Sequence, residues 1–319
     1  MRSLLTAVVL LGGAGMTIRT SSAIILYRFN LQGTYGLSWY GADYSASPPN
    51  STFALVGVLS LDGLGTITKG SITYNDAGTV CEGVITDGSK YSVLPDGEGE
   101  FDINIALKSG TCPITQFAFP ISISSVGGSK VARRVSMGAG QNLAANLTGS
   151  GLAILQARKA IRLSEGSLHN GYSFSWFGHD FLTTTSPNNG FGAVGAIGFS
   201  RNGTILGGSI AYNDGGMVCR AGGLSGKDGL SGAGLAGSYT VHNDGEAIIN
   251  LEIVGPQDPG TCPLTSFVMA AALSDIQSSG TAGRIQFLSA SAAGPGNPDS
   301  PNVVVSGTAI KVGRFVLNK

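Results

Sequence analysis

The chain has 319 residues, of which 42% are hydrophobic and only 12% are charged, and its 19 basic side chains balance 19 acidic ones. This apolar fraction excludes a disordered polymer, and the 50 glycines with few Lys and Glu residues argue against long helices. The neutral charge also argues against nucleic-acid binding, because proteins that neutralise phosphates need a clustered basic surface.

The first 23 residues have the pattern of a secretory signal peptide. Arg2 gives a positive start, residues 4–11 are mainly apolar, and small residues at 21–23 precede an expected cleavage after Ala23. A first strand or a retained anchor is the alternative, because glycines interrupt the apolar stretch. The rest of the chain has no window that predicts a membrane helix. We therefore expect a protein that is secreted or located in the periplasm or cell envelope.

The chain contains one unit twice, because four sequence blocks recur in the same order. LQGTYGLSWYG (31–41) matches LHNGYSFSWFG (168–178), GSITYNDAGTVC (70–81) matches GSIAYNDGGMVC (208–219), SGTCPITQF (109–117) matches PGTCPLTSF (259–267), and GSGLAI (149–154) matches VSGTAI (305–310). Glycine-rich insertions at 221–237 and 294–302 lengthen the second copy and are expected in surface loops. The repeat predicts one domain at 24–156, a linker at 157–166 and a second domain at 167–319.

Both copies have the two-residue period of β-strands. Tyr35, Leu37 and Trp39 alternate with small residues, which places the large side chains on one face of a strand. The first copy has seven such runs, at 31–41, 53–61, 66–74, 90–94, 100–107, 114–123 and 147–155. Turn signals such as Asp62-Gly63 separate them. We predict an all-β fold of two tandem antiparallel β-barrels, about eight strands each, with a β-sandwich as the alternative.

The four cysteines lack the close spacing of a metal site. Cys81 and Cys112 belong to the first copy, Cys219 and Cys262 to the second, and no CxxC pair or adjacent histidine is present. Because each copy keeps one cysteine of each kind, pairing within a copy is the simplest arrangement, and an exported protein meets oxidising conditions. The sequence predicts two disulfides and no metal.

The sequence offers no catalytic constellation and implies no cofactor. It lacks a GxSxG, HExxH or P-loop motif, and the first copy has no counterpart of His169, His179 or His242. Asp43 and Asp180 follow the aromatic strands at matched positions, and His179-Asp180 is the one imaginable proton-transfer pair. Most other matched acids lie in turn sequences, where Asp and Asn bond their own backbone. We predict no catalytic residue, and we favour a non-enzymatic protein over an enzyme.

Large aromatic residues on the matched strands allow a ligand-binding hypothesis. Small eight-stranded barrels either hold one apolar ligand or are filled by their own side chains, and filling is the more common outcome. The candidate ligand-binding residues are Tyr35, Trp39, Asp43, Tyr172, Trp176, His179 and Asp180.

The Y-x-[LF]-x-W strand, the glycine-rich second hairpin and the late SGxAI strand, duplicated behind a signal, resemble exported bacterial tandem β-barrel repeat proteins. These are lipocalin-like in outline, and the resemblance implies an architecture without a catalytic residue. We expect an exported, non-enzymatic protein that binds a small apolar or glycan ligand or has a structural role at the cell surface. The alternative is an isomerase or cyclase with a site near Asp180 and His179.

The cysteine assignment predicts the linkages 81–112 and 219–262. Each bridge would contribute about 3.5 to 4 kcal/mol by the loop-entropy estimate. Mass spectrometry of a digest under non-reducing conditions should detect both linked peptides. Free thiols, or a peptide that links the two copies, would contradict the assignment.

Overall fold

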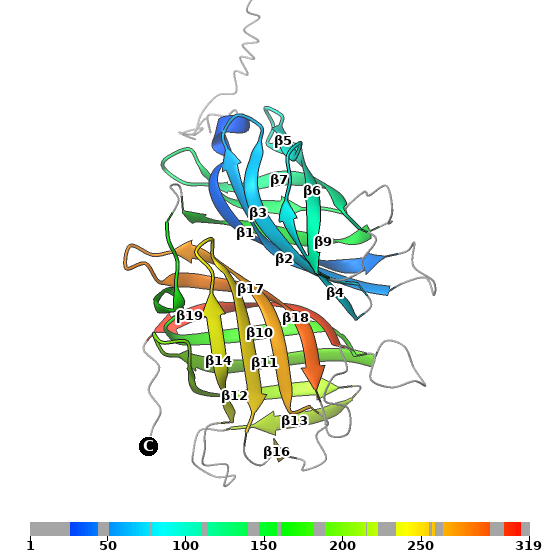
Figure 1. Ribbon diagram of the computed structural model, residues 1–319, viewed down its shortest axis with the longest axis vertical. Helices are drawn as coiled ribbons and strands as arrows, with labels where there is room; N and C mark the ends of the chain where they lie inside the picture. Colours follow the sequence, from blue (N-terminus) through cyan, green and yellow to red (C-terminus); the bar gives the residue numbers. More distant parts are fainter. Residues whose placement is uncertain are drawn as a thin grey trace, which may run out of the picture.

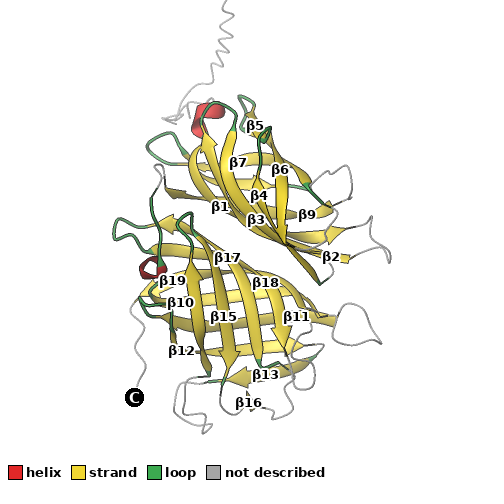
Figure 2. Ribbon diagram, viewed as in Figure 1, coloured by secondary structure: helices red, strands yellow, loops and turns green. Residues whose placement is uncertain are grey.

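The computed structural model describes residues 26–43, 51–76, 78–109, 114–139, 147–157, 161–180, 189–214, 216–222, 234–254, 257–258, 264–293 and 303–313. These residues form two antiparallel β-sheets, one from each copy of the repeat, that lie one above the other along the long axis (Figure 1). Strands dominate the described residues, and two short 3-10 turns are the helical elements among them (Figure 2). The prediction of an all-β fold with two tandem barrels is confirmed. The expected signal peptide at 1–23 lies outside the described residues.

The first sheet closes into a barrel. Its strands are β1 (Gln32–Asp43), β2 (Ser51–Asp62), β3 (Ile67–Asp76), β4 (Thr79–Ile85), β5 (Lys90–Val93), β6 (Glu98–Ser109), β7 (Gln116–Val126), β8 (Ala132–Met137) and β9 (Leu147–Ala157). They pair in the order β4-β3-β2-β1-β9-β8-β7-β6-β5, and β4 also pairs with β6. The β4–β6 pairing joins the two ends of the sheet, and the short β5 is part of the closed wall, because the Tyr91 N–H donates to the Gly65 carbonyl at 2.8 Å just before β3.

The second sheet curls in the same sense. Its strands are β10 (Asn170–Asp180), β11 (Asn189–Phe199), β12 (Ile205–Asp214), β13 (Met217–Ala221), β14 (Leu235–Val241), β15 (Glu246–Ile253), β16 (Gln257–Asp258), β17 (Ser266–Ile276), β18 (Ala282–Ala293) and β19 (Val303–Gly313). Here β14 lies against β12, where Gly234 donates its N–H to the Gly208 carbonyl at 2.9 Å and Tyr239 to that of Gly203 at 2.8 Å.

The glycine-rich insertion at 221–237 is not entirely a surface loop. Its last residues begin β14, and the Leu235 side chain is fully buried in the second barrel. Residues 223–233 of the insertion lie outside the described part of the chain. The insertion therefore lengthens β14 to seven residues, whereas β5 has four.

A short 3-10 turn covers one end of each barrel. The first turn (Arg28–Asn30) precedes β1, and the second (Glu165–Ser167) precedes β10. The residue after each turn is fully buried, and a tyrosine hydroxyl from the wall donates to its carbonyl, Tyr91 to Leu31 at 2.7 Å and Tyr239 to Leu168 at 2.6 Å. Both copies thus close one end of the barrel with the same 3-10 turn and buried leucine.

The matched strands β1 and β10 begin with the same unusual backbone conformation. Gly33 has φ of 114° and Asn170 has φ of 86°. Asparagine tolerates this left-handed region better than other residues with a side chain, because its amide bonds to nearby backbone. Each position adjoins a register shift in the pairing with β9 or β19. The copies therefore keep one backbone irregularity with different residues.

The cysteines of β4 and β13 are buried. Cys81 and Cys219 are both 0% exposed, and each takes part in a disulfide. Cys112 and Cys262 lie outside the described residues. The pairing within each copy therefore remains a prediction.

The outer faces of the two barrels pack on each other through small apolar side chains. This junction cluster consists of Ala54, Val56 and Val58 of β2, Ala270 and Ala272 of β17, Leu288 of β18 and Val304 of β19. Every member is at most 2% exposed. A strand that is buried on both faces reads as a continuous apolar run, which is the pattern of β2 and β17.

The junction joins faces that differ between the copies. By strand register Val56 corresponds to Val194, because they pair with the matched Ser38 and Ser175, yet Val194 is 58% exposed. In the other direction, the matched motifs place Ala272 at the position of Ser122, which is exposed in the first barrel. The contact is therefore not a symmetric one between equivalent surfaces.

The matched valines provide a test of the junction. Val56→Asp should lower the free energy of unfolding by about 3 kcal/mol or more, because it buries an unpaired carboxylate between the barrels. Val194→Asp should cost about 1 kcal/mol at most, mainly through strand propensity. Urea denaturation of both variants measures the difference. Equal losses would contradict the assignment of β2 to a buried junction.

Candidate functional site

Four of the predicted ligand-binding residues fill the barrels. Tyr35 and Trp39 lie in the first core, where the Tyr35 hydroxyl donates to the Ala132 carbonyl at 2.8 Å. Tyr172 and Trp176 occupy the matched positions in the second core. The space beside Trp176 amounts to about 10 Å³, which is about the room that one water needs. These aromatic rings are core side chains.

The two tryptophans differ in their polar contact. The Trp39 Nε1–H donates to the Gly138 carbonyl at 2.9 Å. The Trp176 Nε1 is buried without a partner among the described residues, and its ring stacks on Phe174 at 4.7 Å. Leu37 occupies the position of Phe174 in the first copy. The second core therefore lacks the tryptophan N–H hydrogen bond of the first core and has a larger cluster of aromatic rings around its tryptophan.

The remaining predicted residues lie at strand ends. Asp43 ends β1 and Asp180 ends β10, and their side chains lie outside the described part of the structure. His179 reaches across the junction to the first barrel. Its Nδ1 lies 2.9 Å from the Tyr40 hydroxyl and 3.2 Å from the Thr52 hydroxyl. The structure thus brings His179 together with residues that the sequence did not single out.

A neutral His179 imidazole can accept the Tyr40 hydroxyl proton at Nδ1. Burial lowers the pKa of His179 below its ordinary value of 6.5. Burial also raises the pKa of Tyr40 to about 12, so its hydroxyl keeps the proton that it donates. This arrangement fixes the ring as a junction contact, which does not favour the proton-transfer role near Asp180.

Several other polar residues that the sequence placed in turns serve as turn caps. The Asn75 and Asn213 side chains accept the N–H of Gly78 at 2.9 Å and of Gly216 at 2.8 Å. Asp244 accepts the Glu246 N–H at 3.2 Å. These local bonds confirm the turn interpretation for these residues.

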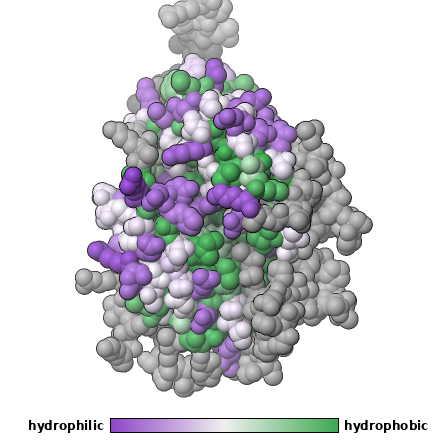
Figure 3. Space-filling view, viewed as in Figure 1, coloured by the Kyte–Doolittle hydropathy of each residue, from purple (hydrophilic) through white to green (hydrophobic). Residues whose placement is uncertain are grey.

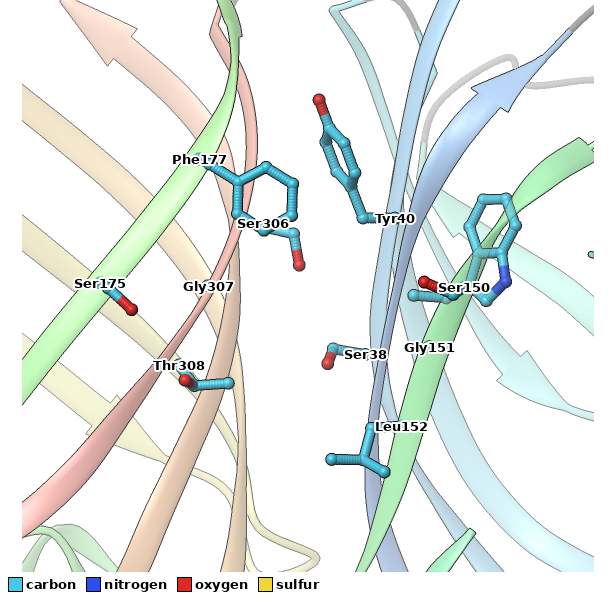
Figure 4. A pocket seen from close by; sticks show the side chains of 11 residues that line it. Ser38, Tyr40, Ser150, Gly151, Leu152, Ser175, Phe177, Ser306, Gly307 and Thr308 are labelled. Atoms are coloured by element: carbon cyan, nitrogen blue, oxygen red, sulfur yellow. The ribbon is translucent and has the colours of Figure 1, made fainter. Parts of the chain in front are cut away.

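The structure contains a pocket of about 290 Å³ between the barrels, where the outer faces of β1 and β9 lie opposite those of β10 and β19 (Figure 4). Apart from Trp39, matched residues of the two copies line it. The pairs are Ser38 with Ser175, Tyr40 with Phe177, Ser150 with Ser306, Gly151 with Gly307 and Leu152 with Thr308. We call this the hydroxyl pocket. The two copies contribute equivalent residues to the pocket, whereas they contribute unlike faces to the junction cluster.

Two aromatic rings meet at the hydroxyl pocket. Tyr40 and Phe177 face each other edge to face with centroids 4.8 Å apart, and Phe177 is 59% exposed (Figure 4). Edge-to-face contacts are favourable for aromatic pairs, and the rest of the Phe177 ring remains open to a ligand. The pocket therefore combines an apolar surface with hydroxyl groups.

The hydroxyls of the pocket differ in what they already bind. Ser38 accepts a hydrogen bond from the fully buried Gln286, 3.1 Å away, whose Nε2 also donates to the Leu152 carbonyl at 2.8 Å. Ser175 and Thr308 have no hydrogen-bonded side-chain partner among the described residues. Gln286 of the second barrel thus positions the wall of the first and leaves other hydroxyls available.

The hydroxyl pocket has the chemistry of a binding site for a neutral molecule. Tyr40 is its one titratable residue, and no charged side chain lines it. Across the described residues, no group of three or more His, Cys, Asp or Glu side chains is placed to hold a metal ion. The described residues also include no helix that is long and apolar enough to cross a membrane.

Sequence reasoning missed this pocket although a signal was present. The serines occur within two of the four matched blocks, next to the tryptophans and in the late SGxAI strand. The alternation along the strands places these serines on the small-residue face, and nothing in the sequence shows that these faces approach each other.

No family model and no curated protein matches the chain. Among solved structures, one assigned as an AttH from Nitrosomonas europaea is 7% identical, with a TM-score of 0.28, over 88% of this chain and 92% of that one. A transferrin-binding protein B variant from Haemophilus parasuis is also 7% identical, with a TM-score of 0.25, over 88% and 75% of the two chains. Likenesses this weak carry no argument, so the fold rests on the strand pairing described above.

The half-buried His179 predicts a pH-dependent junction. Because the folded-state pKa of His179 lies below 6.5, the unfolded chain binds the proton first as the pH falls. The contribution of His179 to stability is therefore complete above pH 6.5 and decreases below it. Wild type should lose more stability between pH 7.5 and 5.5 than His179→Gln, as measured by urea denaturation.

His242→Gln is the matched control for this experiment, because its side chain is exposed. It should retain the pH dependence of the wild type. Identical pH profiles for wild type and His179→Gln would contradict the role assigned to the Tyr40 contact.

Proposed function

We propose that this protein is an exported, non-enzymatic binding protein that takes a small neutral glycan in the hydroxyl pocket between its barrels. The observation that supports the proposal is the uncharged pocket of about 290 Å³, in which hydroxyl side chains surround an exposed phenylalanine ring. This site replaces the barrel interior as the proposed location of the ligand.

A sugar fits this chemistry better than a purely apolar ligand does. Its hydroxyls can exchange hydrogen bonds with Ser175 and Thr308, and its C–H face can lie on the Phe177 ring. An apolar ligand would bury the pocket hydroxyls without partners, which costs free energy. The volume is near the lower end of the usual range for small-molecule sites, about 300 to 1,000 Å³.

The residues of the hydroxyl pocket offer little for catalysis. General acid–base chemistry needs groups that titrate near the working pH, and the one titratable lining residue, Tyr40, has its pKa raised to about 12. The N-terminal pattern and the disulfide-bonded cysteines support export. We therefore prefer a binding role to the isomerase or cyclase alternative.

Calorimetric titration with a panel of neutral mono- and disaccharides tests this function. At least one sugar should bind the wild type, and Phe177→Ala should weaken that binding about tenfold by removing the stacking surface. Phe29→Ala is the matched control, because Phe29 is 55% exposed and lies outside the pocket. It should leave binding unchanged.

Two outcomes would contradict the proposal. Absence of binding across the panel would favour a structural role at the cell surface. Equal effects of Phe177→Ala and Phe29→Ala would place the sugar elsewhere on the protein.

A further inference from the structure

A second and larger cavity lies at the junction, with a volume of about 550 Å³. We call it the basic cavity. The first barrel contributes Thr34, Ser60, Lys69 and Gln156, the segment between the barrels contributes Ile161 and Arg162, and the turn between β14 and β15 contributes His242, Asn243 and Asp244. Figure 3 shows hydrophilic side chains gathered along the junction of the two barrels.

Two cations of this cavity have no ionic partner in the described structure. The ion pairs among the described residues are Lys90 with Asp102 and Arg133 with Asp275. Neither pair includes Lys69 or Arg162. The one acid of the lining, Asp244, bonds the Glu246 N–H of its own turn. The wall therefore presents two cations without an ion-pair partner and one carboxylate, so its net charge is positive.

A buried amide adds an unused donor at the same place. Gln156 is only 4% exposed, and its Nε2 has no hydrogen-bond partner in the described residues. A buried N–H without a partner destabilises the folded state, so such groups in proteins generally have a reason. The unpartnered Gln156 amide is independent of the charges, and it indicates a ligand that carries a hydrogen-bond acceptor.

Comparison of the two copies shows that the polar residues of the cavity wall are specific to the first copy. By strand register, the positions of Thr34, Ser60, Lys69 and Gln156 are occupied in the second copy by Gly171, Gly198, Gly207 and Val312. The second barrel forms the same β-bulge without any polar side chain at these positions. The fold itself therefore does not require the polar group of the first copy.

We propose that the basic cavity binds a sugar acid, a small hydroxylated molecule with one carboxylate. Lys69 and Arg162 neutralise the carboxylate, and charge-assisted hydrogen bonds of this kind are the stronger ones. The Asn243 side chain takes up ligand oxygens, a turn of the Gln156 side chain would bring its buried amide to them, and Ile161 covers an apolar face. This is a site and a ligand class separate from those of the hydroxyl pocket.

The probe for this site is glucuronate, with glucose as its uncharged control. Calorimetric titration should show glucuronate binding at least tenfold more tightly than glucose, with an affinity that falls as salt is added. Lys69→Met combined with Arg162→Met should weaken glucuronate binding at least tenfold. Both side chains are exposed, so the fold should persist, and circular dichroism checks this.

Matched controls locate the site. Lys90→Met with Arg201→Met removes the same two charges outside the cavity and should leave glucuronate binding unchanged. Phe177→Ala should also leave it unchanged, which separates this proposal from that for the hydroxyl pocket. Equal affinity for glucose, equal loss in both double variants, or tighter binding of inorganic phosphate than of glucuronate would each overturn the assignment.

Discussion

The packing of β2 on β17, β18 and β19 is the contact on which the rest of the structure depends. It buries Ala54, Val56 and Val58 on the outside of a barrel, where a lone barrel would expose them. Small side chains let two sheets approach closely, so neighbouring polar residues also meet across the gap. Asn75 donates to the Ser289 carbonyl at 3.1 Å in this way. Both candidate sites exist because this contact brings the two outer surfaces together.

The sequence was sufficient to predict the barrels but not their relation. Alternating aromatic residues, turn signals and the repeat gave the strands of each copy, with β4 and β8 as the strands that were overlooked. In β8 two arginines and a serine separate the buried positions, so its apolar pattern is faint. The junction had two readable signals: β17 replaces the exposed Pro120 and Ser122 of the first copy by buried alanines, and β2 is a continuous apolar run. Neither signal shows which surface covers the other.

The candidate sites were less predictable than the barrels, because they too depend on how the side chains pack in three dimensions. Aromatic residues in a strand can fill a core or line a cavity, and only packing decides between them. Here packing places Trp39 and Trp176 in the cores, whereas Phe177, one position further along, faces the other barrel. The alternation of side chains along a strand therefore separates a structural residue from a candidate binding residue by a single step.

The unlike faces at the junction decide how the two barrels can assemble. A contact between non-equivalent surfaces normally propagates, since every unit keeps one free face for the next. Here the first barrel carries Pro120 and Ser122 where the second carries the alanines that it uses for docking. On this part of the described surface it therefore offers no comparable apolar side chains to a third barrel. Divergence at a few outward positions converts an open-ended mode of stacking into a pair with defined ends.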